Sequence, residues 1–136
     1  MVSFSLVGPT GFRVPLEQTV TRADRRKGLL QRDGLEGVFL IDRCRSVHTI
    51  GMRFALDVAF VSLDTPGPID PTQPQDPYLP LEQSARTIGV SINRVISMPT
   101  NRFGLPRLGS NAVLEAEAGS FARWGLEPGQ RWSIEP

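Results

Sequence analysis

Two side chains with catalytic potential lie close together in the sequence. Cys44 is the only cysteine of the chain and His48 is the only histidine. A thiol and an imidazole can act as a nucleophile and its base, and an imidazole changes its charge near neutral pH. On an extended strand, however, four residues span about 13 Å, which is too far for a direct hydrogen bond. We therefore favour Cys44 as a small apolar filler and His48 as a hydrogen-bonded residue at the rim of the core. In the alternative, a turn at Arg45-Ser46 joins the two, and His48 acts as a general acid or base or contacts a ligand.

Asp57 is a third candidate, because it lies within an apolar stretch between the small residues Ala55 and Ala59. Small neighbours leave room for a packed element or a ligand, and a buried carboxylate needs a partner. Arg53 shares its predicted strand face, and arginines from elsewhere could reach it, namely Arg32, Arg43 and Arg107. One interpretation is a structural bracket to an arginine or to the backbone, and the other is a polar ligand site. The candidate ligand-binding residues are His48, Arg53, Asp57, Arg32 and Cys44.

Other site chemistries find little support in the sequence. One histidine, one cysteine and scattered carboxylates give no metal-ligand spacing, so we predict no metal site and no cofactor. No carboxylate pair is placed for glycoside chemistry, and the glycines at 34–37 are too few to cradle a phosphate. Basic–aromatic pairs such as Arg102-Phe103 and Arg123-Trp124 are scattered along the chain, and the net charge is only +1. These features weigh against nucleic acid as a partner.

The candidate residues are positioned by a predicted strand that begins at Met52. Apolar residues alternate there with Arg53, Asp57 and small residues. Side chains on a strand point to opposite faces in turn, so one face is apolar and the other is sparsely polar. The apolar set is Met52, Phe54, Leu56, Val58 and Phe60. Burial of each large member is worth roughly 1.5–3 kcal/mol, and we therefore expect this strand at the centre of the fold.

Short strands separated by glycine and proline surround this central strand. Residues 2–6 and 12–16 alternate on either side of the Gly8-Pro9-Thr10-Gly11 turn, which predicts a hairpin with Pro15 on an edge strand. Further strands are predicted at 37–41, 86–98, 112–118 and 131–134. In the 86–98 strand the alternation breaks near Asn93, which indicates either a bulge or burial on both faces.

Two short helices complete the predicted elements. Thr21 and Asp24 resemble a capping box, and a helix over about 22–32 follows. Its polar surface holds five basic residues, which are Arg22, Arg25, Arg26, Lys27 and Arg32. We favour a solvated face, with a phosphate or carboxylate site as the alternative. Ser120 is predicted to cap a single helical turn that ends at Gly125.

The many short strands favour a mainly β (α+β) fold, either an antiparallel β-sandwich or a barrel with one or two short helices, over a βαβ arrangement. Residues 1–136 are expected to form a single domain. Half of the 12 prolines lie between Thr65 and Ser84, which predicts a Pro-rich loop at about 65–84. We favour a variable insertion, with a lid or a partner-binding arm as alternatives.

The composition is that of a globular protein, with 40% hydrophobic and 21% charged residues. The single cysteine allows no internal disulfide. No apolar run approaches the ~20 residues that span a bilayer, and the first residues lack the basic start of a signal peptide. We therefore expect a cytoplasmic location and no membrane partner.

Three stretches carry a resemblance to a known family. They read RRKGLLQRDGLEGVFLI, CRSVHTIGMRFALDVAFV and AVLEAEAGSFARWGLEPGQRW. In this order and spacing they resemble the domain-of-unknown-function 192 family, widespread in bacteria and archaea, over about residues 12–65 and 84–134. The resemblance implies a compact, mostly β domain. It brings no established activity, cofactor or catalytic residue.

Three function hypotheses follow from these patterns. The leading one is a non-catalytic β domain that binds an unknown small molecule or protein on the polar strand face around Asp57. The second is a small enzyme that uses His48 with Cys44 or Asp57, and the third is a nucleic-acid-binding β-barrel. The sequence leaves the ligand and the oligomeric state open.

Overall fold

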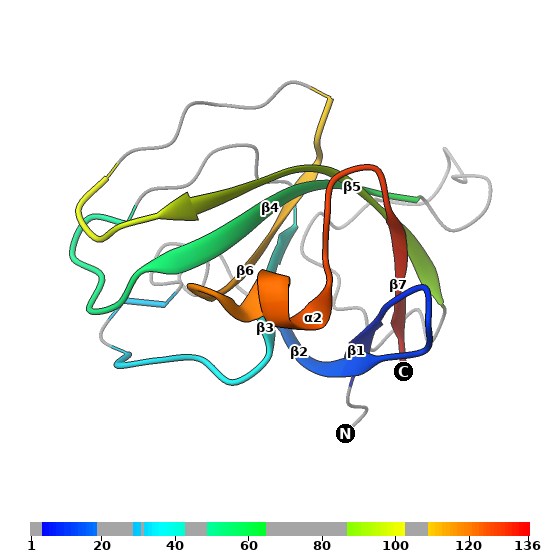
Figure 1. Ribbon diagram of the computed structural model, residues 1–136, viewed down its shortest axis with the longest axis horizontal. Helices are drawn as coiled ribbons and strands as arrows, with labels where there is room; N and C mark the ends of the chain where they lie inside the picture. Colours follow the sequence, from blue (N-terminus) through cyan, green and yellow to red (C-terminus); the bar gives the residue numbers. More distant parts are fainter. Residues whose placement is uncertain (1–3, 19–28, 31, 43–48, 65–86, 103–108) are drawn as a thin grey trace, which may run out of the picture.

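The structure, a computed structural model, describes residues 4–18, 29–30, 32–42, 49–64, 87–102 and 109–136 (Figure 1). In these ranges the chain forms a closed barrel of seven strands in the order β1-β2-β3-β6-β4-β5-β7. The strands are β1 Phe4–Val7, β2 Arg13–Gln18, β3 Val38–Asp42, β4 Leu56–Leu63, β5 Ile88–Met98, β6 Ala112–Glu117 and β7 Arg131–Glu135, and the helix α2 covers Ser120–Trp124. This confirms the predicted mainly β fold and selects the barrel over the sandwich.

The strand pairing is antiparallel at every step of the barrel except one. β2 pairs with β3 in parallel, with Leu16 opposite Val38. β1 and β2 form the predicted hairpin. Pro15 lies in that hairpin, just before the first residue that pairs with β3. β2 is paired on both sides, with β1 and β3, so the predicted edge position of Pro15 was wrong.

The central strand is shorter than the alternation predicted. β4 begins at Leu56, whereas Met52 lies in a turn in which its N–H donates to the carbonyl of Thr49. Gly51 has a φ of 79°, so the backbone leaves the extended conformation at this point. The predicted start at Met52 was therefore wrong. The central position was right, because the first six residues of β4 are all buried.

Both faces of β4 are buried, which corrects the predicted polar face. Ala59 and Val61 point into the barrel and join an inner core. The inner core contains Phe4, Leu6, Val38, Leu40, Ala59, Val61, Ile88, Val90, Ile92, Ala112, Leu114, Ala116, Phe121, Leu126, Trp132 and Ile134. The face that was expected to be sparsely polar is thus the barrel interior.

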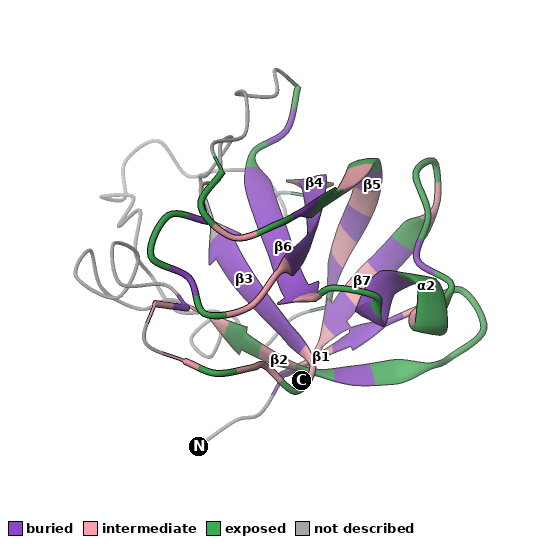
Figure 2. Cartoon of the chain, turned by 60° about the vertical axis from the view of Figure 1, so that its left-hand side comes forward, coloured by how far each residue is buried: buried purple, intermediate pink, exposed green. Residues whose placement is uncertain are grey.

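The opposite face of β4 contributes to a second cluster outside the barrel, which we name the outer core. Its buried members are Leu29, Phe39, Ile41, Met52, Leu56, Val58, Phe60, Met98 and Val113. Leu30, Leu35, Phe54 and Ile96 pack against it. Figure 2 colours β3 and β6 almost entirely as buried. The sheet β3-β6-β4 therefore has no solvent-exposed face.

The predicted irregularity near Asn93 is a β-bulge. Phe60 of β4 pairs with Arg94 and Val61 pairs with Ile92, so Asn93 is the extra residue on β5. Its amide donates to Ser62 Oγ and Ser110 Oγ at 2.9 and 3.0 Å. The bulge therefore ties β5 to β4 and to the start of β6.

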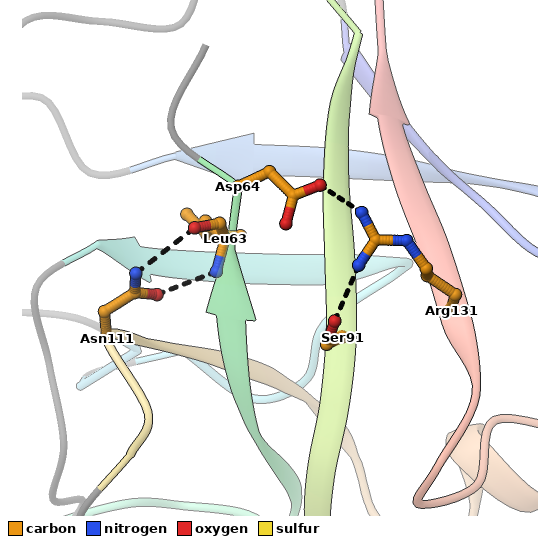
Figure 3. Close-up of polar contacts among 5 residues, drawn as sticks. All are labelled: Leu63, Asp64, Ser91, Asn111 and Arg131. Atoms are coloured by element: carbon orange, nitrogen blue, oxygen red, sulfur yellow. Dashed lines mark hydrogen bonds and ion pairs between the residues drawn. The ribbon is translucent and has the colours of Figure 1, made fainter. Parts of the chain in front are cut away.

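Polar side chains hold the ends of the strands together on the side of β5 and β7. Arg131 of β7 forms an ion pair with Asp64 and donates to Ser91 Oγ of β5 (Figure 3). Asn111 exchanges two hydrogen bonds with the backbone of Leu63, at 2.8 and 3.2 Å. All of these pairs are solvent-exposed. Such exposed contacts contribute modestly to stability and mainly fix the strand ends.

Several predictions fall wholly or partly on segments that the structure does not describe. The Pro-rich loop predicted at 65–84 lies outside the described residues. The helix predicted over 22–32 is described only at Leu29, Leu30 and Arg32, and these residues are not helical. The predicted C-terminal end of that helix was therefore wrong.

We predict that Gly37→Ala destabilises the protein more than Gly11→Ala. Both glycines have a positive φ, 82° and 89°, but a Cβ at Gly37 would collide with the backbone oxygen of Pro15, whereas Gly11 has open space. Both variants therefore carry backbone strain. The collision should lower the free energy of unfolding of Gly37→Ala by a further ~1–3 kcal/mol. Chemical denaturation measures the difference, and equal losses would contradict the close approach of β2 and β3.

Candidate functional site

One carboxyl group occupies the middle of the outer core. Along β6, Leu114 and Ala116 point into the barrel, so Val113 and Glu115 point to the outer face. The strand register places Glu115 directly opposite Phe39 of β3 and Val58 of β4. A glutamate is therefore held between two buried apolar side chains.

Glu115 has no partner within the described part of the chain. The residue is only 5% exposed, and no hydrogen bond or ion pair to a described residue satisfies its carboxyl group. Glu117, on the same strand face, is satisfied, because it accepts a hydrogen bond from the Leu35 N–H at 3.2 Å. Burial raises the pKa of the Glu115 carboxyl group from 4.5 to about 7. A polar group that is buried without a partner is costly, and such groups concentrate at functional sites.

A cation lies one strand away from this carboxyl group. Phe39 is flanked by Glu17 of β2 and Glu115 of β6, which gives a continuous row across the outer face. Arg32 donates to Glu17 at 2.8 Å, and its guanidinium carbon lies 5.8 Å from the centre of the Phe39 ring. The structure therefore places Arg32, a predicted site residue, at the end of the row that contains Glu115.

Asp57 has a structural role, because its carboxylate links β4 to β5 and to the start of α2. Its two carboxylate oxygens accept hydrogen bonds from Ser97 Oγ at 3.0 Å and from the backbone N–H groups of Gly119 and Phe121 at 2.9 and 3.0 Å. Asp57 thus supplies from β4 the capping oxygen that the first turn of α2 needs.

The cap of α2 differs from the predicted one. Ser120 is the first helical residue, and the N-cap position is Gly119, which has a φ of 92° and no side chain to cap with. The prediction of Ser120 as the cap was therefore wrong. The predicted end at Gly125 is confirmed, because Gly125 is in the left-handed conformation with φ 70°.

Arg53 does not share a face with Asp57. It precedes β4 and forms an exposed ion pair with Asp33 at 3.2 Å. Arg53 and Asp57 therefore contact different residues. Cys44 and His48 lie outside the described residues, as do Arg43 and Arg107.

Two loops beside the outer core are bound to each other through Thr49. The Thr49 hydroxyl donates to the carbonyl of Pro99 at 2.5 Å and accepts from the Arg102 N–H at 2.9 Å. Asn101, in the left-handed conformation with φ 59°, accepts from the Gly51 N–H. These hydrogen bonds fix the loop that carries Met52 to the loop that follows Met98, next to the sheet. They support one border of the outer core.

Sequence reasoning did not select Glu115 as a candidate. It placed Glu115 on the strand 112–118, on the same face as Val113. The available signal was a glutamate on an apolar strand face, but its burial depends on what β3, β4 and the loop residues place around it. That information is not contained in the β6 sequence.

The described ranges contain neither a candidate metal-binding cluster nor a helix that could span a membrane. No group of three or more histidine, cysteine, aspartate and glutamate side chains there could hold a metal ion. No helix in the same ranges is long and apolar enough to cross a bilayer.

The chain belongs to the domain-of-unknown-function 192 family (DUF192, "Uncharacterized ACR"), whose profile matches residues 7–134. The resemblance noted in the sequence is thereby confirmed. The family description assigns no activity. A search of the curated proteins gave no match.

Solved structures with a similar fold include two bacterial proteins. A protein of unknown function from Novosphingobium aromaticivorans is 23% identical with a TM-score of 0.62, and the match covers 99% of this chain and 84% of that one. A "putative transcription regulator" from Sinorhizobium meliloti is 17% identical with a TM-score of 0.56, covering 98% and 91%. At these identities the likeness concerns the fold alone.

We predict that Glu115→Gln removes a pH dependence of stability. The folded protein holds the Glu115 proton up to about pH 7, whereas the unfolded chain releases it near 4.5. Stability is therefore highest below pH 4.5 and falls as the pH rises to about 7, by on the order of 3 kcal/mol. Denaturant unfolding of both proteins between pH 4 and 8 isolates this effect, because all other groups are shared. Parallel curves would show that Glu115 ionises normally.

Asp57→Ala should lower the free energy of unfolding by about 2–4 kcal/mol, because the N–H groups of Gly119 and Phe121 lose their acceptor. Asp33→Ala is the matched control, since it removes a carboxylate from an exposed pair and should cost no more than about 0.5 kcal/mol. If urea denaturation gives the two variants the same free energy of unfolding, the hydrogen bonds of Asp57 do not contribute substantially to stability.

Proposed function

We propose that this protein is a non-catalytic binding domain whose ligand, a small molecule, docks on the outer face of the barrel beside Glu115. The observation that carries the proposal is the buried carboxyl group without a partner in the described chain, held between Phe39 and Val58. A ligand with a hydrogen-bond donor would satisfy this carboxyl group within its apolar surroundings. Small-molecule sites combine these two features, a mostly apolar lining and a few convergent polar groups.

This proposal moves the expected site from Asp57 to the opposite face of the sheet. All of the contacts of Asp57 are internal, to Ser97, Gly119 and Phe121, which supports a structural role. Glu115, in contrast, has no partner among the residues that the structure describes. Its ionisation at neutral pH would reduce stability, and proteins retain such groups where function needs them.

A second candidate is an acid–base enzyme at the same position. The observation in its favour is the pKa of Glu115 at about 7, where a carboxyl group can both donate and accept a proton. This candidate replaces Asp57 by Glu115 in the enzyme hypothesis. The role of His48 and Cys44 in it stays a prediction from the sequence, as do a bacterial origin and a cytoplasmic location.

The proposed function predicts that small polar metabolites shift NMR signals of outer-core methyl groups. Val58, Val113 and Met98 report on the outer face, while Val90 and Leu114 report on the barrel interior. A methyl-labelled sample titrated with a metabolite library should give shifts confined to the outer-core set. The same hits should lose about tenfold or more in affinity in Glu115→Gln.

The matched control for this screen is Glu117→Gln. Glu117 lies on the same strand face but already accepts from Leu35, and glutamine keeps an acceptor for that bond. This variant should bind the hits like the wild type. Hits that shift only inner-core methyls, or that bind Glu115→Gln equally well, would contradict the proposed site. Turnover of a hit by the wild type would favour the enzyme candidate.

A further inference from the structure

We propose that the ligand of the outer-face site is an organic cation, an ammonium or guanidinium group on a short apolar body, which pairs with the Glu115 carboxylate. This inference rests on the proposed function and names the chemical class of its ligand. The juxtaposition that carries it is the row Glu17, Phe39 and Glu115 on three adjacent strands.

The row contains two acids with one aromatic ring between them. On the Glu17 side the protein itself provides a cation, because Arg32 pairs with Glu17 at 2.8 Å and lies over the Phe39 ring. On the Glu115 side the described chain provides none. The same arrangement of carboxylate and ring is thus complete at one end and incomplete at the other. A ligand cation would occupy the position that corresponds to that of the Arg32 guanidinium.

Because Glu115 is buried, the charge of a ligand group beside it decides whether that group is attracted or repelled. Glu115 is only 5% exposed, so little water can solvate its carboxylate. An ion pair is then the interaction that most stabilises the charged form of the carboxylate. An aromatic ring beside it adds attraction for a cation over its face. A ligand anion would be repelled at the same place. Val58 and Phe39 would contact the apolar body of the ligand.

The described charged groups around Glu115 have other partners or lie in another row of the sheet. On β2, Glu17 is already paired with Arg32. On β6, Glu117 is a second acid, and it accepts from Leu35. On β5, Arg94 is exposed and lies opposite Phe60. Phe60 pairs with Val113, so Arg94 belongs to the row next to that of Glu115. In the loop before β4, Arg53 pairs with Asp33. None of the cations in the described ranges contacts Glu115.

The test compares three probes of the same shape and different charge, namely benzylammonium, benzyl alcohol and benzoate. Calorimetry and methyl NMR are run on the wild type, Glu115→Gln and Glu117→Gln at pH 8. We expect the wild type to prefer benzylammonium over benzyl alcohol by about tenfold or more and to bind benzoate least. Glu115→Gln should lose that preference and Glu117→Gln should keep it. Glu115→Gln is expected to fold at this pH, because it removes a destabilising buried charge.

A second readout is the pH dependence of binding. Benzylammonium keeps its charge between pH 5 and 8, so its affinity should rise over this range as Glu115 ionises and should level off above about 7. The affinity for benzyl alcohol should stay constant. In Glu115→Gln both affinities should be independent of pH.

The outcomes separate this inference from the proposed function. If benzyl alcohol or benzoate shifts the outer-core methyls as strongly as benzylammonium, the site binds ligands but the inferred charge is wrong. If no probe shifts these methyls, the organic-cation inference is overturned, whereas the metabolite screen judges the binding function independently. A preference for benzylammonium that persists in Glu115→Gln would overturn the assignment of Glu115 as its partner.

Discussion

The constraint on which the rest of this structure depends is that the sheet β3-β6-β4 is buried on both faces. The inner face packs into the barrel and the outer face packs under the loop residues of the outer core. A sheet without a solvent-exposed face cannot leave a polar side chain to water, so each such side chain must find a partner inside the protein. Asp57 meets this requirement through the backbone of α2. Glu115 does not meet it within the described chain, and this difference divides the two carboxylates into a structural group and a candidate functional group.

Much of the fold follows from local patterns in the sequence. Alternating residues and glycine–proline turns predicted the β1–β2 hairpin and the strands after it, because period-2 patterns are local properties of the chain. The break in alternation near Asn93 indicated either a bulge or burial on both faces, and the structure has the bulge. The start of β4 was placed too early because the alternation continues across Met52 although the turn at Gly51 interrupts the strand. Alternation also cannot tell which of two faces is the barrel interior. For that reason the face with Asp57 was interpreted as sparsely polar, with Ala55 and Ala59 leaving room for a packed element or a ligand. Ala59 instead lines the inner core.

The candidate site could be predicted only in part. Arg32 was selected as an arginine that could reach Asp57, but it pairs with Glu17 of β2, which the parallel pairing with β3 places in the row of Glu115. Glu115 was missed because its meaning depends on register with two strands that are distant in the sequence. Side-chain neighbours across a sheet are long-range information, and a single sequence does not contain the register. Asp57 was correctly recognised as needing a partner, and one of the two interpretations, a bracket to the backbone, matches its contacts.

Glu115 is a buried carboxyl group without a partner in the described ranges of the chain. The most direct measurement is the pH titration of its side-chain carboxyl carbon by NMR, with the signal assigned from its loss in Glu115→Gln. The account predicts a single transition with a midpoint of about 7, well above the ordinary value of 4.5. A midpoint near 4.5 would mean that water or another group already stabilises the carboxylate, and it would contradict the account.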